Sequence, residues 1–255
     1  MANKGWRDTE LLVAMNLYCR LPFGCFHSRH PKVIEFANLL GRTSGALAMK
    51  LCNLASLDST HQARGVKGLG NASRMDREIW RQFEENWTSM VQASEEAVQS
   101  LAAGLSVEGD FCFEINTNYT GYDVLAETKR RQGQQFFRES VLASYENRCC
   151  ITGNPLSELL IASHILPWAV SQKDRLNPRN GLCLARTQDA AFDAGLITLD
   201  EEFRVLLSPR LQEVCSEETL NDNFKKYEGR QINLPTRFRP DKQFIAYHRR
   251  IHSAA

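Results

Sequence analysis

Four polar side chains in the C-terminal half combine residue types that can do chemistry together: His164, Asn180, Asp189 and Asp193. A neutral imidazole can accept a proton from water near neutral pH. Oxygen ligands with few imidazoles among them favour Mg²⁺ or Mn²⁺ over zinc. These residues can therefore support proton transfer beside one divalent cation.

The surrounding sequence predicts the elements that must position these side chains. The run "LLIASHILPW" is typical of a β-strand that carries His164 near its end and stops at a proline, and "GLCL" predicts a second strand. "TQDAAFDAG" predicts a short helix ended by Gly195. Asp189 and Asp193 are i and i+4 on that helix and share one face. A strand, a loop, a strand and a helix can bring all four side chains around one small space.

Each of these residues also has a purely structural interpretation. His164 could be a hydrogen-bonded core histidine, and Asn180 in "NPRNG" could be a turn residue. Asp189 could cap a helix, and Asp193 could be a surface acid or a partner of an arginine. The adjacent Cys149 and Cys150, like Cys183, are expected to be small core residues. The eight cysteines include no C-x-x-C pair, which favours free thiols in a reducing cytoplasm.

Four phrases, taken in order, resemble the HNH nuclease family, which has the ββα-metal fold. They are "RRQGQQFFRESVLASYENRCCITG", "LIASHILPW", "NPRNGLCL" and "DAAFDAGLI". The resemblance covers roughly residues 128–210 and is strongest to bacterial modification-dependent and other restriction endonucleases, in which a DNA-reading domain precedes the HNH module. It implies a DNA endonuclease.

The resemblance also implies roles for individual residues. His164 would be the general base, and Asn180 would hold the loop and the His164 ring in place. Asp189 and Asp193 would hold Mg²⁺ or Mn²⁺, one cation per active site, which stabilises the transition-state charge and the leaving oxygen. Ser163 stands where the family often has an aspartate or histidine ligand, so it is a third candidate ligand. The family often has a further histidine around position 188 or 189, where this chain has Gln188 and Asp189.

The N-terminal part is expected to be helical. Apolar spacing predicts helices at residues 9–19, 31–40 and 44–54, with a break at Gly41 and a cap at Thr43 or Ser44. The last two form a helix-turn-helix signature, and the basic, glycine-containing segment 61–74 could be a wing along DNA. A plain helical bundle is the alternative. Residues 75–105 predict a longer acidic helix, 109–124 a strand and loop, and 134–146 a helix.

The net charge of +1 conceals a basic N-terminal third, an acidic middle and a basic C-terminal half. A local basic face is sufficient to bind phosphates. The basic tail with His248, Arg249, Arg250 and His252 is interpreted as surface or DNA-backbone contacts. The predicted DNA-binding residues are Arg42, Lys50, Arg64, Lys67, Lys129, Arg130, Arg131, Arg138, Arg179 and Arg186.

The expectation is an α+β protein with a helix-turn-helix or winged-helix-like DNA-reading domain at 1–105, a connecting strand or linker at 106–127 and an HNH nuclease domain at 128–255. It would cut double-stranded DNA, as a bacterial restriction enzyme in the cytoplasm. Cutting both strands implies a homodimer or two binding events, and no membrane segment is expected. The alternatives are a DNA-binding regulator with a weak or inactive HNH-like domain, suggested by Ser163 and Gln188, and an RNA-targeting or toxin nuclease.

Overall fold

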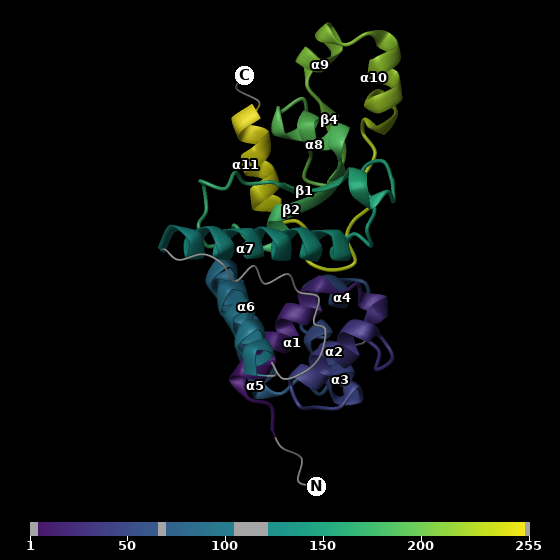
Figure 1. Cartoon of the computed structure of the whole chain (residues 1–255). Helices are drawn as coiled ribbons and strands as arrows, with labels where there is room; N and C mark the ends of the chain where they lie inside the picture. The colour runs from purple at the N-terminus through teal and green to yellow at the C-terminus, as the bar shows by residue number, and fades with distance from the viewer. Residues whose placement is uncertain (1–4, 66–69, 105–121, 253–255) are drawn as a thin grey trace. The chain divides into compact units, whose positions relative to one another are not determined.

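The structure, a computed structural model, describes residues 5–65, 70–104 and 122–252. The chain divides into two compact units, Met1–Phe136 and Phe137–Ala255, each with its own core (Figure 1). Helices combined with two small antiparallel sheets are compatible with the α+β class. The functional domain limits at 105, 127 and 128 remain a prediction. Within the described ranges, no helix is both long and apolar enough to span a membrane.

The first unit is built from helices around α1, which contacts α2, α3, α5 and α6 (Figure 1). A 3₁₀ turn at Phe23–Cys25 follows α1. The bounds are α1 Asp8–Arg20, α2 Pro31–Leu39, α3 Ser44–Ala55, α4 Ser59–Ala63, α5 Arg74–Glu85, α6 Trp87–Gly104 and the first part of α7, Tyr122–Ser144.

The helical pair α2–α3 forms where the sequence predicts it. Pro31 occupies the first turn of α2, where its missing N–H costs nothing. Gly41 makes the break with a φ of +60°, which glycine adopts without strain. Thr43 Oγ1 accepts a hydrogen bond from the Ala46 N–H at 3.2 Å and caps α3. Leu47 is fully buried on the inward face of α3.

The predicted long helix at 75–105 is two helices. The break lies at Asn86, whose backbone is not helical (φ −153°, ψ 85°) and whose side chain accepts a hydrogen bond from the Ser89 N–H at 3.1 Å. Asparagine favours such a cap over a helix interior because its side chain competes for backbone groups.

The wing remains a prediction. Every regular element described between residues 5 and 136 is helical. Lys67 and the middle of the predicted wing lie outside the described residues, as does most of the strand and loop predicted at 109–124. The end of that prediction, from Tyr122, is helical in α7. The basic lead-in before residue 134 belongs to the same helix, where Arg131 pairs with Glu127 one turn earlier at 3.0 Å.

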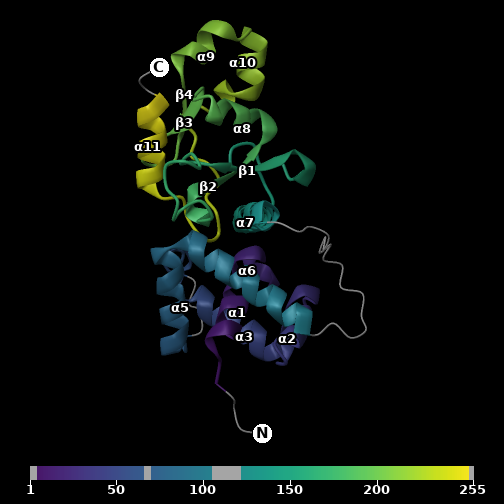
Figure 2. The same ribbon diagram turned by 60° about the vertical axis from the view of Figure 1, so that its left-hand side comes forward.

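The second unit contains the strand, strand and helix that the sequence predicts. β1 (Leu160–His164) pairs antiparallel with β2 (Gly181–Ala185), with His164 opposite Gly181. α8 (Arg186–Asp193) contacts both strands (Figure 2). A Cβ at Gly181 would lie 2.3 Å from Val141 Cγ2 of α7. Only glycine therefore lets α7 approach the hairpin this closely.

The rest of the second unit follows α8 in the sequence. A second antiparallel pair, β3 and β4, lies beside α8, and α11 contacts β3 (Figure 2). Short 3₁₀ helices are found at Ser157–Leu159, Pro178–Asn180 and Lys225–Tyr227. The bounds are β3 Ile197–Leu199, β4 Val205–Leu207, α9 Pro209–Val214, α10 Glu217–Asn223 and α11 Lys242–His252.

The core of the second unit includes three thiols at the hairpin. Cys149, Cys150 and Cys183 are buried, as expected of small core residues. Burial is the main cause that raises the pKa of the Cys183 thiol to about 12, so it is neutral and poorly suited to bind a metal. The seven cysteines within the described ranges all have free thiols.

Candidate active site

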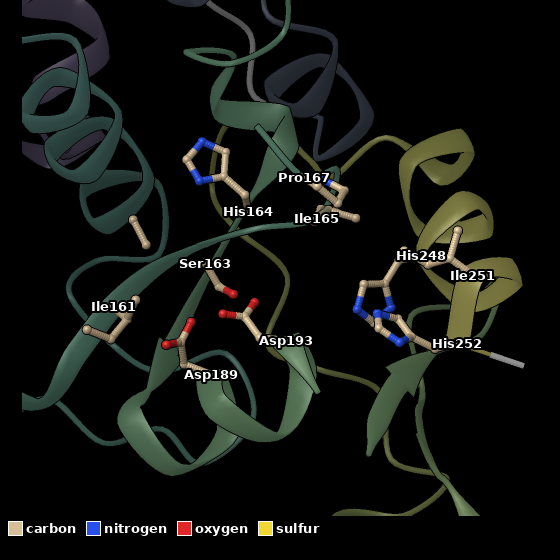
Figure 3. A pocket seen from close by; sticks show the side chains of 11 residues that line it. Ile161, Ser163, His164, Ile165, Pro167, Asp189, Asp193, His248, Ile251 and His252 are labelled. Carbon is tan, nitrogen blue, oxygen red and sulfur yellow. The ribbon is translucent and has the colours of Figure 1, made fainter. Parts of the chain in front are cut away.

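A cavity of about 410 Å³ lies between β1, α8 and α11 of the second unit (Figure 3). It brings together His164, Ser163, Asp189 and Asp193, four of the five predicted catalytic and metal-binding residues. It also contains two histidines of the C-terminal helix. The lining residues are Ile161, Ala162, Ser163, His164, Ile165, Pro167, Asp189, Asp193, His248, Ile251 and His252.

His164 is held by a main-chain carbonyl and two aromatic rings. Its Nε2 lies 2.9 Å from the Arg175 carbonyl oxygen. Because a carbonyl only accepts, Nε2 carries the hydrogen and Nδ1 is the nitrogen able to accept a proton. The ring stacks on Phe137, with centroids 3.9 Å apart, and meets Trp168 edge-on. Burial lowers the pKa of His164, and the bond to Arg175 only partly opposes this. The imidazole is therefore neutral near pH 7.

Asn180 positions the loop that holds His164. It is 2 % exposed, and its Oδ1 accepts a hydrogen bond from the Leu166 N–H at 2.7 Å. Its Nδ2 donates to the Asp174 carbonyl oxygen at 3.2 Å and to that of Leu166 at 3.4 Å. These bonds join both ends of the loop that carries the Arg175 carbonyl. Asn180 thus acts on His164 through the loop rather than by direct contact.

Ser163, Asp189 and Asp193 turn their oxygens toward one another (Figure 3). Ser163 is 3 % exposed, and its Oγ has no hydrogen-bond partner in the described part of the chain. Burial raises the pKa of Asp193, the charge of Asp189 adds to this, and His252 opposes it. α8 begins after Ala185, so Asp189 is not its N-cap.

These three side chains fit a hard divalent cation. Two carboxylates that repel each other and one unsatisfied hydroxyl form an all-oxygen donor set of the kind Mg²⁺ or Mn²⁺ prefers. A cation would relieve both the repulsion and the unmet hydrogen-bonding capacity of Ser163. Among the described residues, no group of three or more His, Cys, Asp or Glu side chains is arranged to hold a metal. Any cation held here would therefore need the hydroxyl or water as well.

Gln188 is structural. It is buried, and its Nε2 donates to the Asn223 carbonyl oxygen at 3.2 Å. The neighbouring Asp189, and not Gln188, lines the cavity. Gln188 therefore contributes no ligand to this site.

His248 and His252 of α11, interpreted from the sequence as surface or DNA-backbone contacts, line the cavity. The interpretation of His248 as a surface residue is wrong: it is 3 % exposed, its Nε2 donates to the Phe192 carbonyl oxygen, and its Nδ1 accepts from Thr198 Oγ1, both at 3.0 Å. Burial, and then the charge of His252, lower the pKa of His248 to about 4. The i, i+3, i+7 spacing of Ile245, His248 and His252 was the available signal, since it predicts one inward helix face.

Three predicted phosphate contacts form contacts within the protein. Lys50 is 5 % exposed, and its ammonium lies 2.6 Å from Asp76 Oδ1. Arg42 bonds Glu10 at 2.9 Å and stacks over Trp6. Arg138 donates to the Leu160 carbonyl oxygen at 2.8 Å. Lys50 is unavailable to DNA because breaking its buried pair would leave an uncompensated charge, whereas Arg42 and Arg138 are half-buried.

The other predicted DNA contacts are more accessible. Arg64 and Arg186 are exposed, and Arg179 is half-buried. Lys129 pairs with Glu96, whereas Arg130 and Arg131 pair with Glu127, all at the surface. Exposed pairs of this kind contribute little stability, about 0–1 kcal/mol, so these side chains can exchange their partners for phosphates.

Residues 149–200 match the family model described as HNH endonuclease. The match contains β1, β2, α8, β3 and every predicted catalytic and metal-binding residue. The second unit therefore carries an HNH endonuclease domain, and the family expected from the sequence is supported at this level. No curated protein matches the chain.

Proposed function

We propose that this protein is a metal-dependent DNA endonuclease that hydrolyses phosphodiester bonds in the cavity beside His164. The observation that carries the proposal is the neutral His164, with Nε2 held by the Arg175 carbonyl and Nδ1 able to accept a proton. It lies within the segment that matches HNH endonucleases and lines the same cavity as the two carboxylates.

The proposed reaction begins at the His164 ring. Nδ1 accepts a proton from the water that attacks phosphorus, while the Arg175 carbonyl keeps the ring oriented and stabilises the imidazolium that forms. Asn180 holds the loop in place so that this carbonyl does not move. Ser163, Asp189 and Asp193 would hold Mg²⁺ or Mn²⁺, which supplies stabilisation of the transition-state charge and of the leaving oxygen.

We infer that the protein acts in a bacterial, cytoplasmic restriction system in which the first unit reads a DNA site, with or without a modified base. Residues 1–77 carry 11 Lys and Arg against 5 Asp and Glu, which supports contact with phosphates. The short break between α2 and α3, which are in contact, supports the helix-turn-helix interpretation. Cleavage of both strands would need a homodimer or two binding events.

The test is cleavage of plasmid and phage DNAs that carry different base modifications, with Mg²⁺, Mn²⁺ and other divalent ions. Wild type should nick or cut some of these DNAs with Mg²⁺ or Mn²⁺, and His164→Ala should bind the same DNA without cutting it. Melting temperature gives a second readout: Mn²⁺ should stabilise wild type, and Asp189→Asn should remove that effect. Equal cutting by wild type and His164→Ala would contradict the proposal.

A DNA-binding regulator without nuclease activity is the second candidate. The neutral Ser163 favours it, because a hydroxyl is a weaker ligand than the carboxylate or imidazole found there in the family. The same experiment separates the two functions. A regulator binds DNA but cuts none of the panel with any ion, and Mn²⁺ does not change its melting temperature. Preferential cutting of RNA would instead identify an RNA-targeting nuclease.

A further inference from the structure

We propose that His252, at the end of α11, is a further substrate-contacting residue that donates a hydrogen bond to a phosphate oxygen of bound DNA. The inference rests on the proposed nuclease function. His252 lies outside residues 149–200, which match the endonuclease family. It nevertheless lines the same cavity as Asp189 and Asp193 (Figure 3).

α11 is held firmly against the carboxylate-bearing helix. His248 bonds the carbonyl oxygen of Phe192, which directly precedes Asp193, and also bonds Thr198 in β3. Its ring lies parallel to that of Phe192, with centroids 3.7 Å apart. Ile245, one turn earlier, is 2 % exposed. The position of the last turn of α11 relative to Asp193 is therefore set by packing and by directional bonds.

Of the two histidines, His252 is the one able to bind a ligand. Both ring nitrogens of His248 are used in hydrogen bonds within the protein. The His252 ring lies beside it, with centroids 4.5 Å apart, and is half-exposed. Its nitrogens form no hydrogen bond with any residue that the structure describes.

The backbone opposite His252 leaves room for the ring. A Cβ at Gly195 would lie 2.2 Å from His252 Nδ1 and 2.4 Å from Cγ. No side chain fits there while the ring keeps its place. Because Nδ1 faces Gly195, we assign the donated hydrogen bond to Nε2, the nitrogen farther from this backbone.

The negative charge of the cavity explains why a hydrogen-bond donor from α11 would help to bind a phosphate. Asp189 and Asp193 repel a phosphate, and a divalent cation between them balances this charge but supplies no hydrogen-bond donor from α11. A neutral imidazole donates one N–H, so the contact requires no protonation. The adjacent Arg249 is already bonded to the Leu199 carbonyl oxygen and Glu201. His252 is then the α11 side chain in the cavity that can meet a phosphate oxygen.

The first test measures DNA binding by the full chain carrying His164→Ala, with Mn²⁺, by fluorescence anisotropy on a duplex. Adding His252→Ala should weaken binding about tenfold, the lower end of the effect of one lost hydrogen bond to a charged group. His252→Gln should restore most of it because its amide also donates. Gln243→Ala is the matched control: it removes an exposed donor from α11 outside the cavity and should leave binding unchanged.

The second test measures cleavage by protein with His164 intact. His252→Ala should raise KM and lower kcat/KM about tenfold, with a melting temperature equal to that of Gln243→Ala. Unchanged binding and unchanged kcat/KM in His252→Ala would overturn the inference. So would a loss that His252→Gln does not rescue, because that outcome assigns the ring to packing.

The two proposals can fail separately. If wild type cuts nothing but His252→Ala still weakens DNA binding and His252→Gln rescues it, the nuclease function fails and the phosphate contact stands. If wild type cuts DNA and His252→Ala matches it in binding and rate, only the phosphate contact fails.

Discussion

At the scale of single residues, His164 is oriented by a main-chain carbonyl and not by a carboxylate. A carbonyl fixes the tautomer as a carboxylate would, but it provides less stabilisation for the charged imidazolium. The position of that carbonyl then depends on the side-chain amide of Asn180, which joins both ends of the loop. His164 therefore accepts the proton, and a different residue, Asn180, keeps the His164 ring in place.

Replacement of Asn180 tests this dependence. In Asn180→Asp, the oxygen that replaces Nδ2 faces the carbonyls of Asp174 and Leu166, which can only accept. We expect a loss of about 1–3 kcal/mol in the free energy of unfolding and a rate of cleavage lower by about 10². Chemical denaturation and single-turnover cleavage measure the two effects. The same change at the exposed Asn38 is the control, and equal behaviour of the two variants would contradict the role assigned to Asn180.

At the scale of elements, the hairpin β1–β2 and helix α8 carry the predicted chemistry, and α11 completes the cavity from far along the chain. The close approach of α11 to the end of α8 requires glycine at position 195 for two reasons. Its φ of +68° suits glycine, and its missing Cβ leaves space for the His252 ring. Gly153 has a similar φ of +73° with nothing near its Cβ position.

These two glycines allow the packing effect to be separated from the backbone effect. Gly153→Ala should lose about 1–2 kcal/mol of unfolding free energy through backbone strain alone. Gly195→Ala should lose about 1–3 kcal/mol more because the His252 ring has to move. Thermal or chemical denaturation measures the difference. Combining Gly195→Ala with His252→Ala should remove most of the excess, and an unchanged excess would show that the ring is not the obstacle.

At the scale of the whole molecule, a nearly neutral net charge is divided between basic and acidic segments. Whether a cation contributes to DNA binding depends on its burial. Lys50 is enclosed with Asp76 in the first unit. Arg186, at the start of α8, is exposed and forms no ion pair with the residues described. We therefore expect Arg186 to contact phosphates and Lys50 to stabilise the fold.

Salt dependence distinguishes these functions. Arg186→Ala should reduce the slope of log K against log salt for DNA binding by about 1, since one phosphate contact is lost. Lys50→Met should leave that slope unchanged but should lower the unfolding free energy by about 3–5 kcal/mol, because Asp76 loses its buried partner. Anisotropy titrations at several salt concentrations, with denaturation curves, measure both. A slope lowered equally by both substitutions would contradict the assignment.

The sequence by itself determined the local elements around the chemistry. Strand, strand and helix lie where "LLIASH", "GLCL" and "TQDAAFD" predict them, because alternation, turn residues and helical spacing act over a few neighbouring positions. The i, i+4 spacing likewise places Asp189 and Asp193 on one helix face. The α2–α3 pair was predictable for the same reason, from Gly41 and the cap at Thr43.

Only the tertiary structure decided how these elements are completed by distant parts of the chain. It placed the Arg175 carbonyl on His164, turned Gln188 toward Asn223, buried Lys50 with Asp76, and brought His248 and His252 to the cavity. Each of these contacts joins residues separated by more than two turns of helix or by a loop. Local propensity carries no information about such pairs, because packing and the pairing of buried polar groups select them when the whole unit folds.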